Sequence, residues 1–116
     1  MRILIVEDDP FIALDLQAIV EGEGHSVVRL CSSLADARRH LVEEFDFALL
    51  DVDLGDGKSF EVASRLCERC IPFAFVSASS RSELPSDLRG AVFIAKPYIE
   101  ATIVRTIAVG SVVYAA

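Results

Sequence analysis

Short apolar runs alternate with amphipathic stretches along the whole chain. The runs are rich in Ile, Val, Leu and Phe, and we predict one strand from each of five segments: 3–6, 25–30, 47–52, 73–77 and 91–95. Apolar runs of this length and β-branched content are typical of parallel strands covered on both faces of a sheet. The pattern therefore predicts a five-stranded parallel sheet.

The stretches between the runs predict helices. The first begins at Asp9-Pro10, which supplies an N-cap and a first-turn proline, and it ends at Gly22 and Gly24. The residues expected on buried helix faces are Ile12, Leu16, Ile19 and Val20 in the first helix, Leu34, Ala37, Leu41 and Phe45 in the second, Phe60, Ala63 and Leu66 in the third, and Ile103 and Ile107 in the last.

Serines and prolines mark the ends of the middle helices. Ser32 or Ser33 is expected to cap the second helix, and Ser59 the third. Ile71-Pro72 is expected to end the third helix, because proline biases the preceding residue away from helical angles.

The helical pattern weakens over residues 79–90. Pro85 lies where a fourth helix should run, and a proline inside a helix costs roughly 3 kcal/mol, so we predict a short or irregular fourth helix. A last helix begins at about Glu100, and the apolar tail 109–116 either extends it or covers an interface. Alternating strands and helices of this kind predict an α/β fold, a doubly wound sheet with helices on both faces.

Composition limits the class of protein. The 116 residues are 53% hydrophobic, which is enough for one core, so we expect a single domain over 1–116. The net charge of −7 argues against direct binding to nucleic acid. No run is long enough for a membrane span and no signal peptide is evident, so a cytoplasmic location is expected. The three cysteines are an odd number, which favours reduced thiols, and Cys67 and Cys70 lack further metal ligands.

Charged residues follow three of the predicted strands. Glu7-Asp8-Asp9 follows the first, Asp51 ends the third, and Lys96-Pro97 follows the last. Each has an ordinary explanation alone, since acids favour a helix N-terminus and lysine favours the surface. However, ligands of such sheets bind beyond the carboxyl ends of the strands, which share one edge. The sequence therefore predicts one pocket that holds several acids and one lysine.

These motifs carry a family resemblance. Val6-Glu7-Asp8-Asp9, Leu50-Asp51, Ser77-Ala78 and Lys96-Pro97 stand in order at predicted strand ends. From Ile3 to about Val109 the chain resembles a response-regulator receiver domain, the phospho-acceptor part of bacterial two-component signalling. The resemblance implies a flavodoxin-like fold with strand order 2-1-3-4-5.

The resemblance also implies a phospho-acceptor and a Mg²⁺ site. Asp51 would accept the phosphoryl group as an acyl phosphate. Asp8, Asp51 and the backbone oxygen of Asp53 would bind Mg²⁺, which prefers oxygen ligands, and Glu7 would act through water. Aligning the acid pair one residue later would make Asp9 a ligand, although its first role is to cap the helix.

Four further residues complete the implied site. Lys96 would pair with a phosphoryl oxygen, and a compact ammonium also lowers the repulsion among neighbouring carboxylates. Ser77 matches the switch serine or threonine of the family, and Phe93 its switch aromatic residue, although core packing explains a phenylalanine equally well. Pro97 matches a position that commonly follows a cis peptide bond.

Two segments depart from the common family pattern. The loop 53–57 is shorter than usual, and so is the stretch 77–96, which holds Pro85. Together with residues 71–75, these features resemble the FAT-GUY subgroup of single-domain receivers, although Ser77-Ala78-Ser79 replaces its Thr-Gly-Tyr. Docking on the usual fourth and fifth helices is therefore not carried over to this chain.

The resulting hypothesis is a phosphorelay receiver that takes a phosphoryl group from a histidine kinase or a histidine phosphotransfer protein. It would signal to a downstream protein or serve as a phosphate sink, and it would catalyse only its own phosphorylation and aspartyl-phosphate hydrolysis. A homodimer, and a piece of a larger protein, are both compatible with the sequence. The alternative is a phosphorylation-independent interaction module with receiver shape. A nucleotide-binding enzyme would need a Gly-rich loop in place of Glu7-Asp8-Asp9.

Overall fold

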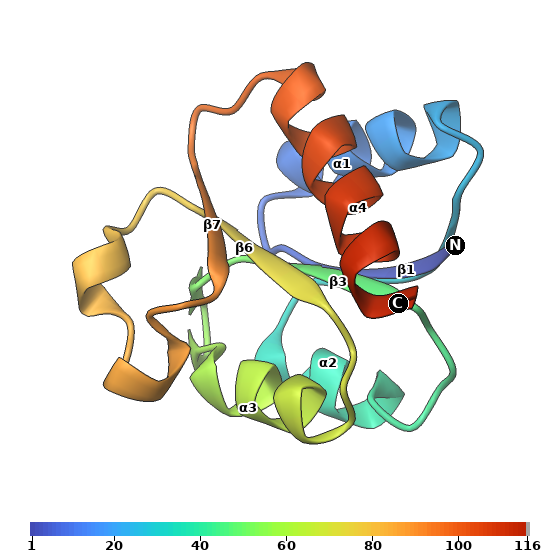
Figure 1. The fold of residues 1–116 in the computed structure, drawn as a ribbon. Helices are drawn as coiled ribbons and strands as arrows, with labels where there is room; N and C mark the ends of the chain where they lie inside the picture. The colour runs from blue at the N-terminus through green and yellow to red at the C-terminus, as the bar shows by residue number, and fades with distance from the viewer. Residues whose placement is uncertain (116) are drawn as a thin grey trace.

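The computed structural model describes residues 1–115, with side chains for residues 1–110. Its main sheet has five parallel strands in the order β2-β1-β3-β6-β7 (Figure 1). These strands are β1 (Arg2–Val6), β2 (Ser26–Cys31), β3 (Phe47–Leu50), β6 (Phe73–Ser77) and β7 (Val92–Ala95). The predicted fold class is confirmed, and the ends of the five strands lie within two residues of the predicted bounds.

Helices cover both faces of the sheet. These are α1 (Pro10–Gly22), α2 (Leu34–His40), α3 (Phe60–Glu68) and α4 (Glu100–Ala115). Contacts pair α1 with α4 and α2 with α3, and the two pairs lie on opposite sides of the strands (Figure 1). All four residues of β3 are buried. Side chains that alternate along the central strands therefore enter two separate cores, which explains why these strands are apolar throughout.

The expected boundaries of α1 are confirmed. Asp9 is the N-cap, and its Oδ1 accepts hydrogen bonds from the amides of Phe11 and Ile12 at 2.9 and 3.3 Å. The helix ends at Gly22, and Gly24 has a φ of 84°, a value that glycine adopts readily. This cap is important for the site, because it fixes the chain directly after β1.

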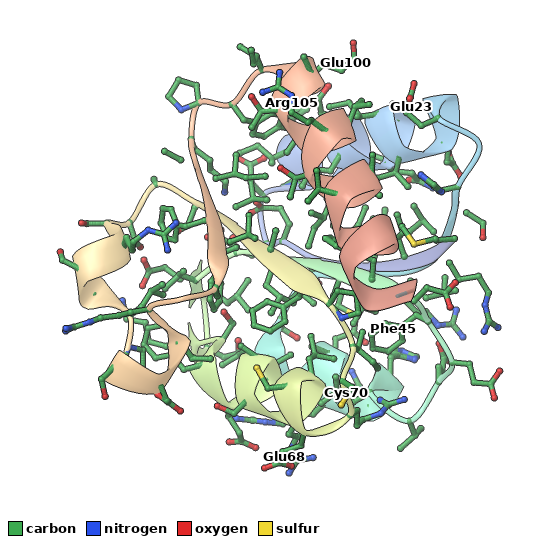
Figure 2. All side chains as sticks on the ribbon, viewed as in Figure 1. Glu23, Phe45, Glu68, Cys70, Glu100 and Arg105 are labelled. Carbon is green, nitrogen blue, oxygen red and sulfur yellow. The ribbon has the colours of Figure 1, made fainter. Side chains whose placement is uncertain are left out.

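The third helix differs from the prediction at both ends. Ser59 precedes α3 but makes no capping hydrogen bond with its side chain. The helix ends at Glu68, before Pro72, and Cys70 has a left-handed φ of 57°. Arg69 packs over the Phe45 ring at 5.5 Å and donates to the Leu41 carbonyl, at the end of the molecule where Figure 2 labels Phe45 and Cys70. Tertiary contacts, rather than the proline, therefore accompany the end of this helix.

The fourth helix of the predicted pattern is irregular, as expected. The segment holds two 3₁₀ turns, η1 (Arg81–Glu83) and η2 (Ser86–Leu88), on either side of Pro85. Arg81 ties the segment together, since its Nη1 donates to the carbonyls of Arg89 and Ala91 at 2.9 and 2.8 Å.

A small hairpin follows β3. It comprises β4 (Asp53–Leu54) and β5 (Gly57–Lys58), which pair antiparallel around the turn 55–56. The turn was predicted, but the two strands were not.

The sequence left open whether the apolar tail extends the last helix or covers an interface, and the backbone of α4 continues to Ala115, while residue 116 lies outside the described residues. Gly110 allows close packing here, because a Cβ at this position would clash with the Phe47 ring. Over the described residues, no helix combines the length and apolar character required to cross a membrane.

Candidate functional site

Three carboxylates meet at the carboxyl edge of the sheet. Glu7 and Asp8 follow β1, and Asp51 follows β3, which is the neighbour of β1. One carboxylate oxygen from each of the three residues lies within 4.8 Å of the others. Glu7 and Asp51 are buried, with exposures of 3% and 6%, whereas Asp8 is exposed. The parallel strands thus gather acids that are far apart in sequence.

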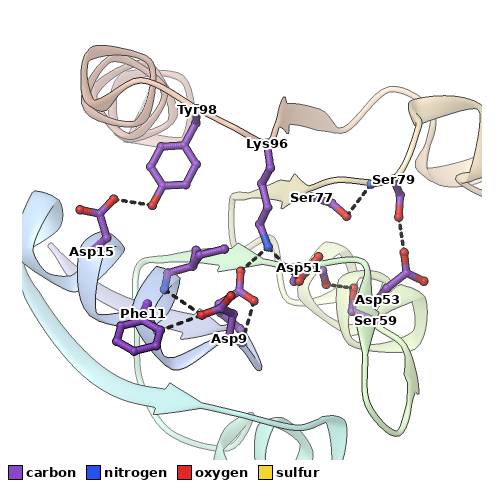
Figure 3. Close-up of polar contacts among 12 residues, drawn as sticks. Asp9, Phe11, Asp15, Asp51, Asp53, Ser59, Ser77, Ser79, Lys96 and Tyr98 are labelled. Carbon is purple, nitrogen blue, oxygen red and sulfur yellow. Dashed lines mark hydrogen bonds and ion pairs between the residues drawn. The ribbon is translucent and has the colours of Figure 1, made fainter.

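A lysine from the edge strand completes the group. Lys96 follows β7, and its Nζ lies 2.6 Å from Glu7 Oε1 and 3.1 Å from Asp51 Oδ2 (Figure 3). These are charge-assisted hydrogen bonds between largely buried side chains. One ammonium therefore faces three carboxylates, and the site keeps an excess of negative charge.

Burial and the neighbouring charges shift the pKa values of both Glu7 and Lys96. Burial raises the pKa of Glu7 from 4.5 to about 7, against the opposing effect of the Lys96 and Asp9 hydrogen bonds. Burial lowers the pKa of Lys96, but its bonds to Glu7 and Asp51 outweigh this effect and raise the pKa above 10.5. A further cation would offset the excess of negative charge that three carboxylates and one ammonium leave in the site.

The donor set fits a hard divalent cation. Carboxylate oxygens are the ligands that Mg²⁺ and Ca²⁺ prefer, and an exposed member such as Asp8 leaves room for coordinated water. The pairing of the hairpin strands points to the Asp53 backbone oxygen as a further candidate ligand. The Ser59 amide donates to the Val52 carbonyl at 3.0 Å, so the next pair, Asp53 and Lys58, is a non-hydrogen-bonded pair of the ladder. The Asp53 carbonyl is therefore not used by the hairpin.

The backbone at Asp51 is held from two sides. Its amide donates to the Val6 carbonyl at 2.9 Å, and the hydroxyl of the fully buried Ser59 donates to its carbonyl at 2.5 Å. This is what Ser59 does in place of capping α3. Sequence reasoning missed the role, because a serine before a helix has a simpler local explanation.

Ser77 and Ser79 lie on the opposite side of the site from Glu7. Ser77 is buried at the end of β6, and its Oγ accepts the Ser79 amide at 3.1 Å. The hydroxyl of Ser79 donates to the Asp53 carboxylate (Figure 3). The same carboxylate also pairs with Lys58. Lys58 and Ser79 lower the pKa of Asp53 through these bonds.

The side chains of the other expected residues lie outside the group of three carboxylates. Asp9 lies outside the metal-ligand group, and its carboxylate is used by the cap of α1. Phe93 is half-buried on β7, next to Phe75 and under the Arg81 guanidinium at 5.8 Å. The Lys96-Pro97 peptide bond is cis, as expected. Tyr98 then donates to Asp15 at 2.6 Å and ties this loop to α1 (Figure 3).

Comparisons with known proteins agree with this geometry. A family model for the response regulator receiver domain matches residues 3–108. Phyllosphere-induced regulator PhyR from Methylorubrum extorquens is 34% identical over 107 residues, which cover 88% of this chain and 40% of that protein. This chain therefore spans less than half of that relative.

Two solved structures share the fold. SdrG from Sphingomonas melonis Fr1 is 33% identical, with a TM-score of 0.83 and coverage of 95% of both chains. The non-phosphorylated HemR receiver domain from Leptospira biflexa is 27% identical, with a TM-score of 0.79 and coverage of 94% of this chain and 92% of that one.

Proposed function

The chain belongs to the family of response regulator receiver domains of two-component signalling, and from this premise we propose that Asp51 accepts a phosphoryl group from a phosphohistidine. One observation carries the proposal: the carboxylate of Asp51 lies among Glu7, Asp8 and Lys96 at the carboxyl edge of the sheet. Asp51 is the member of the group that can react, because it borders both the lysine and the Ser77 end of β6.

The proposed chemistry is a phosphoryl transfer. An oxygen of Asp51 forms a bond to phosphorus while the P–N bond of the phosphohistidine breaks, and the electron pair leaves with the imidazole nitrogen. Such transfers rely mainly on positioning and on neutralising charge. Lys96 supplies one positive charge at the acceptor and pairs with a phosphoryl oxygen. Asp8, Asp51 and the Asp53 carbonyl would hold Mg²⁺, with Glu7 acting through water, and the ion would neutralise further charge.

Ser77 supports a switch. In the unphosphorylated protein its Oγ accepts the Ser79 amide. On phosphorylation the Ser77 hydroxyl would turn and donate to a phosphoryl oxygen, which releases Ser79 and the start of the segment 79–91. Phe93 lies beneath Arg81 of that segment and would respond to its movement. The phosphorylated state would then differ from the unphosphorylated one on this surface.

We propose that a histidine kinase or phosphotransfer protein in the cytoplasm is the donor, and that the output is contact with another protein. The relative PhyR is named a regulator, which agrees with a signalling role. The net charge of −7 disfavours an output through nucleic acid.

The test is intact-mass spectrometry after incubation with Mg²⁺ and a small donor such as acetyl phosphate or phosphoramidate. We expect a gain of one phosphoryl group, which is lost with EDTA and in Asp51→Asn, and slower transfer in Lys96→Ala. A gain that persists in Asp51→Asn would refute the assignment. No gain in folded wild-type protein would favour the phosphorylation-independent interaction module instead.

A further inference from the structure

The turn of the β4–β5 hairpin is anchored to α2 by one carboxylate. Asp56 lies in this turn, and its Oδ1 accepts the Leu34 amide at 2.9 Å while its Oδ2 accepts the Ala35 amide at 3.1 Å. These are the first two amides of α2, which have no partner within the helix. The next capping bond is made by Ser33, whose hydroxyl accepts the Asp36 amide at 3.1 Å. The start of α2 is thus capped by its own chain and by the hairpin.

The hairpin needs such an anchor. Two-stranded hairpins are marginal on their own, and each strand here has two residues. At its open end, the Ser59 amide bonds to the Val52 carbonyl. At its closed end, Asp56 bonds to α2, and Gly57 packs closely, since a Cβ there would lie 3.1 Å from Leu34 Cδ1. Without Asp56, the closed end would lose its polar attachment.

The same hairpin carries Asp53, whose backbone oxygen is a candidate ligand for the cation. The Asp53 carbonyl is outside the ladder, and the Asp53 side chain bridges Lys58 and Ser79. Asp53 is separated from Asp56 only by Leu54, which is buried, and Gly55. A shift at the turn would therefore move the Asp53 oxygen relative to the carboxylates of Glu7, Asp8 and Asp51.

We infer that Asp56 is a positioning residue, which couples the start of α2 to divalent-cation binding by fixing the loop that presents the Asp53 carbonyl. The inference rests on the proposed function, because it requires a cation at the acidic group. It assigns no ligand role to Asp56 itself, whose two carboxylate oxygens are both occupied by α2. Because coupling is reciprocal, the cation should in turn stabilise the bonds between Asp56 and α2.

The first test compares the Mg²⁺ affinity of two variants, each of which removes one side chain that caps α2. Asp56→Ala and Ser33→Ala each remove a cap of α2, but only the first releases the hairpin. By isothermal titration well below the unfolding temperature, we expect Asp56→Ala to weaken Mg²⁺ binding about five-fold or more, and Ser33→Ala to change it less than two-fold. Asp56→Asn, which keeps one acceptor oxygen, should bind with intermediate affinity and remains usable if the alanine variant does not fold.

The second test uses the reciprocal effect in the wild-type protein. Mg²⁺ should slow hydrogen exchange at the Leu34 and Ala35 amides more than at the Asp36 amide, which is capped by Ser33. Equal Mg²⁺ affinity in the wild type, Asp56→Asn and Asp56→Ala, or an equal loss in Ser33→Ala, would overturn the inference alone. Failure of the wild-type protein to bind Mg²⁺ would instead refute the proposed cation site, and this inference with it.

Discussion

Replacing Asp51 by asparagine should stabilise the protein in EDTA, since it removes a buried charge whose desolvation cost exceeds the net attraction of its neighbours. With an effective dielectric constant of about 20, two carboxylates no more than 4.8 Å apart repel by about 3.5 kcal/mol or more, and the 3.1 Å pair of Asp51 and Lys96 attracts by about 5 kcal/mol. Exposed Asp8 adds a smaller, screened repulsion. The attraction of Asp51 to Lys96 therefore exceeds its repulsion from the other carboxylates by about 2 kcal/mol or less. Burying the Asp51 carboxylate, in contrast, costs several kcal/mol. The burial cost decides the sign, and we expect a gain of about 1–3 kcal/mol.

Urea unfolding at pH 8 measures this effect, because Glu7 is then mostly ionised. Wild type, Asp51→Asn and the control Asp87→Asn should be compared in EDTA and in Mg²⁺; Asp87 is exposed and outside the acidic group. We expect Asp51→Asn alone to gain stability in EDTA, and Mg²⁺ to stabilise wild type and Asp87→Asn but hardly Asp51→Asn. The reasoning fails if Asp51→Asn is less stable than wild type in EDTA, or if Mg²⁺ stabilises it equally.

Other substitutions test separate parts of the structure. Gly110→Ala should lower stability by about 1–3 kcal/mol despite the better helix propensity of alanine, because the new methyl group meets the Phe47 ring. The control Gly22→Ala places its methyl group in open space and should not lower stability, and thermal unfolding compares the two variants. Ser59→Ala should cost about 1–3 kcal/mol in urea unfolding and slow phosphorylation, because it leaves a buried carbonyl at the acceptor without its donor. The raised pKa of Glu7 means that its contribution to folding stability is complete below pH 4.5 and is lost as the pH rises through about 7. The expected change is about 3 kcal/mol, and a pH series of unfolding measurements in EDTA should show it in the wild type but not in Glu7→Gln.

The strand ends were predictable because parallel strands share one carboxyl edge. Once 3–6, 47–52 and 91–95 were recognised as strands, the meeting of Glu7, Asp51 and Lys96 followed from topology. The cap at Asp9 was equally local, since an acid before proline needs only the next turn of helix.

The missed features depend on contacts between distant segments. The β4–β5 strands are too short for any periodicity to show, and they are held by Ser59 and by the bonds of Asp56 to the first amides of α2. Ser59 was misread for the same reason, because its partner is the Asp51 carbonyl eight residues earlier. The end of α3 likewise involves Arg69, whose partners Leu41 and Phe45 lie beyond α2. Local propensity carries no information about such partners.

The most direct measurement locates the phosphoryl group in wild-type protein treated with a phosphohistidine donor and Mg²⁺. Borohydride reduction converts an aspartyl phosphate to homoserine, and trypsin should release the peptide 40–58, which contains Asp51 with three other aspartates. We expect fragmentation to place homoserine at residue 51 and at none of the other three. Modification at Asp46, Asp53 or Asp56, or at no aspartate of this peptide, would contradict the assignment of Asp51 as the phospho-acceptor.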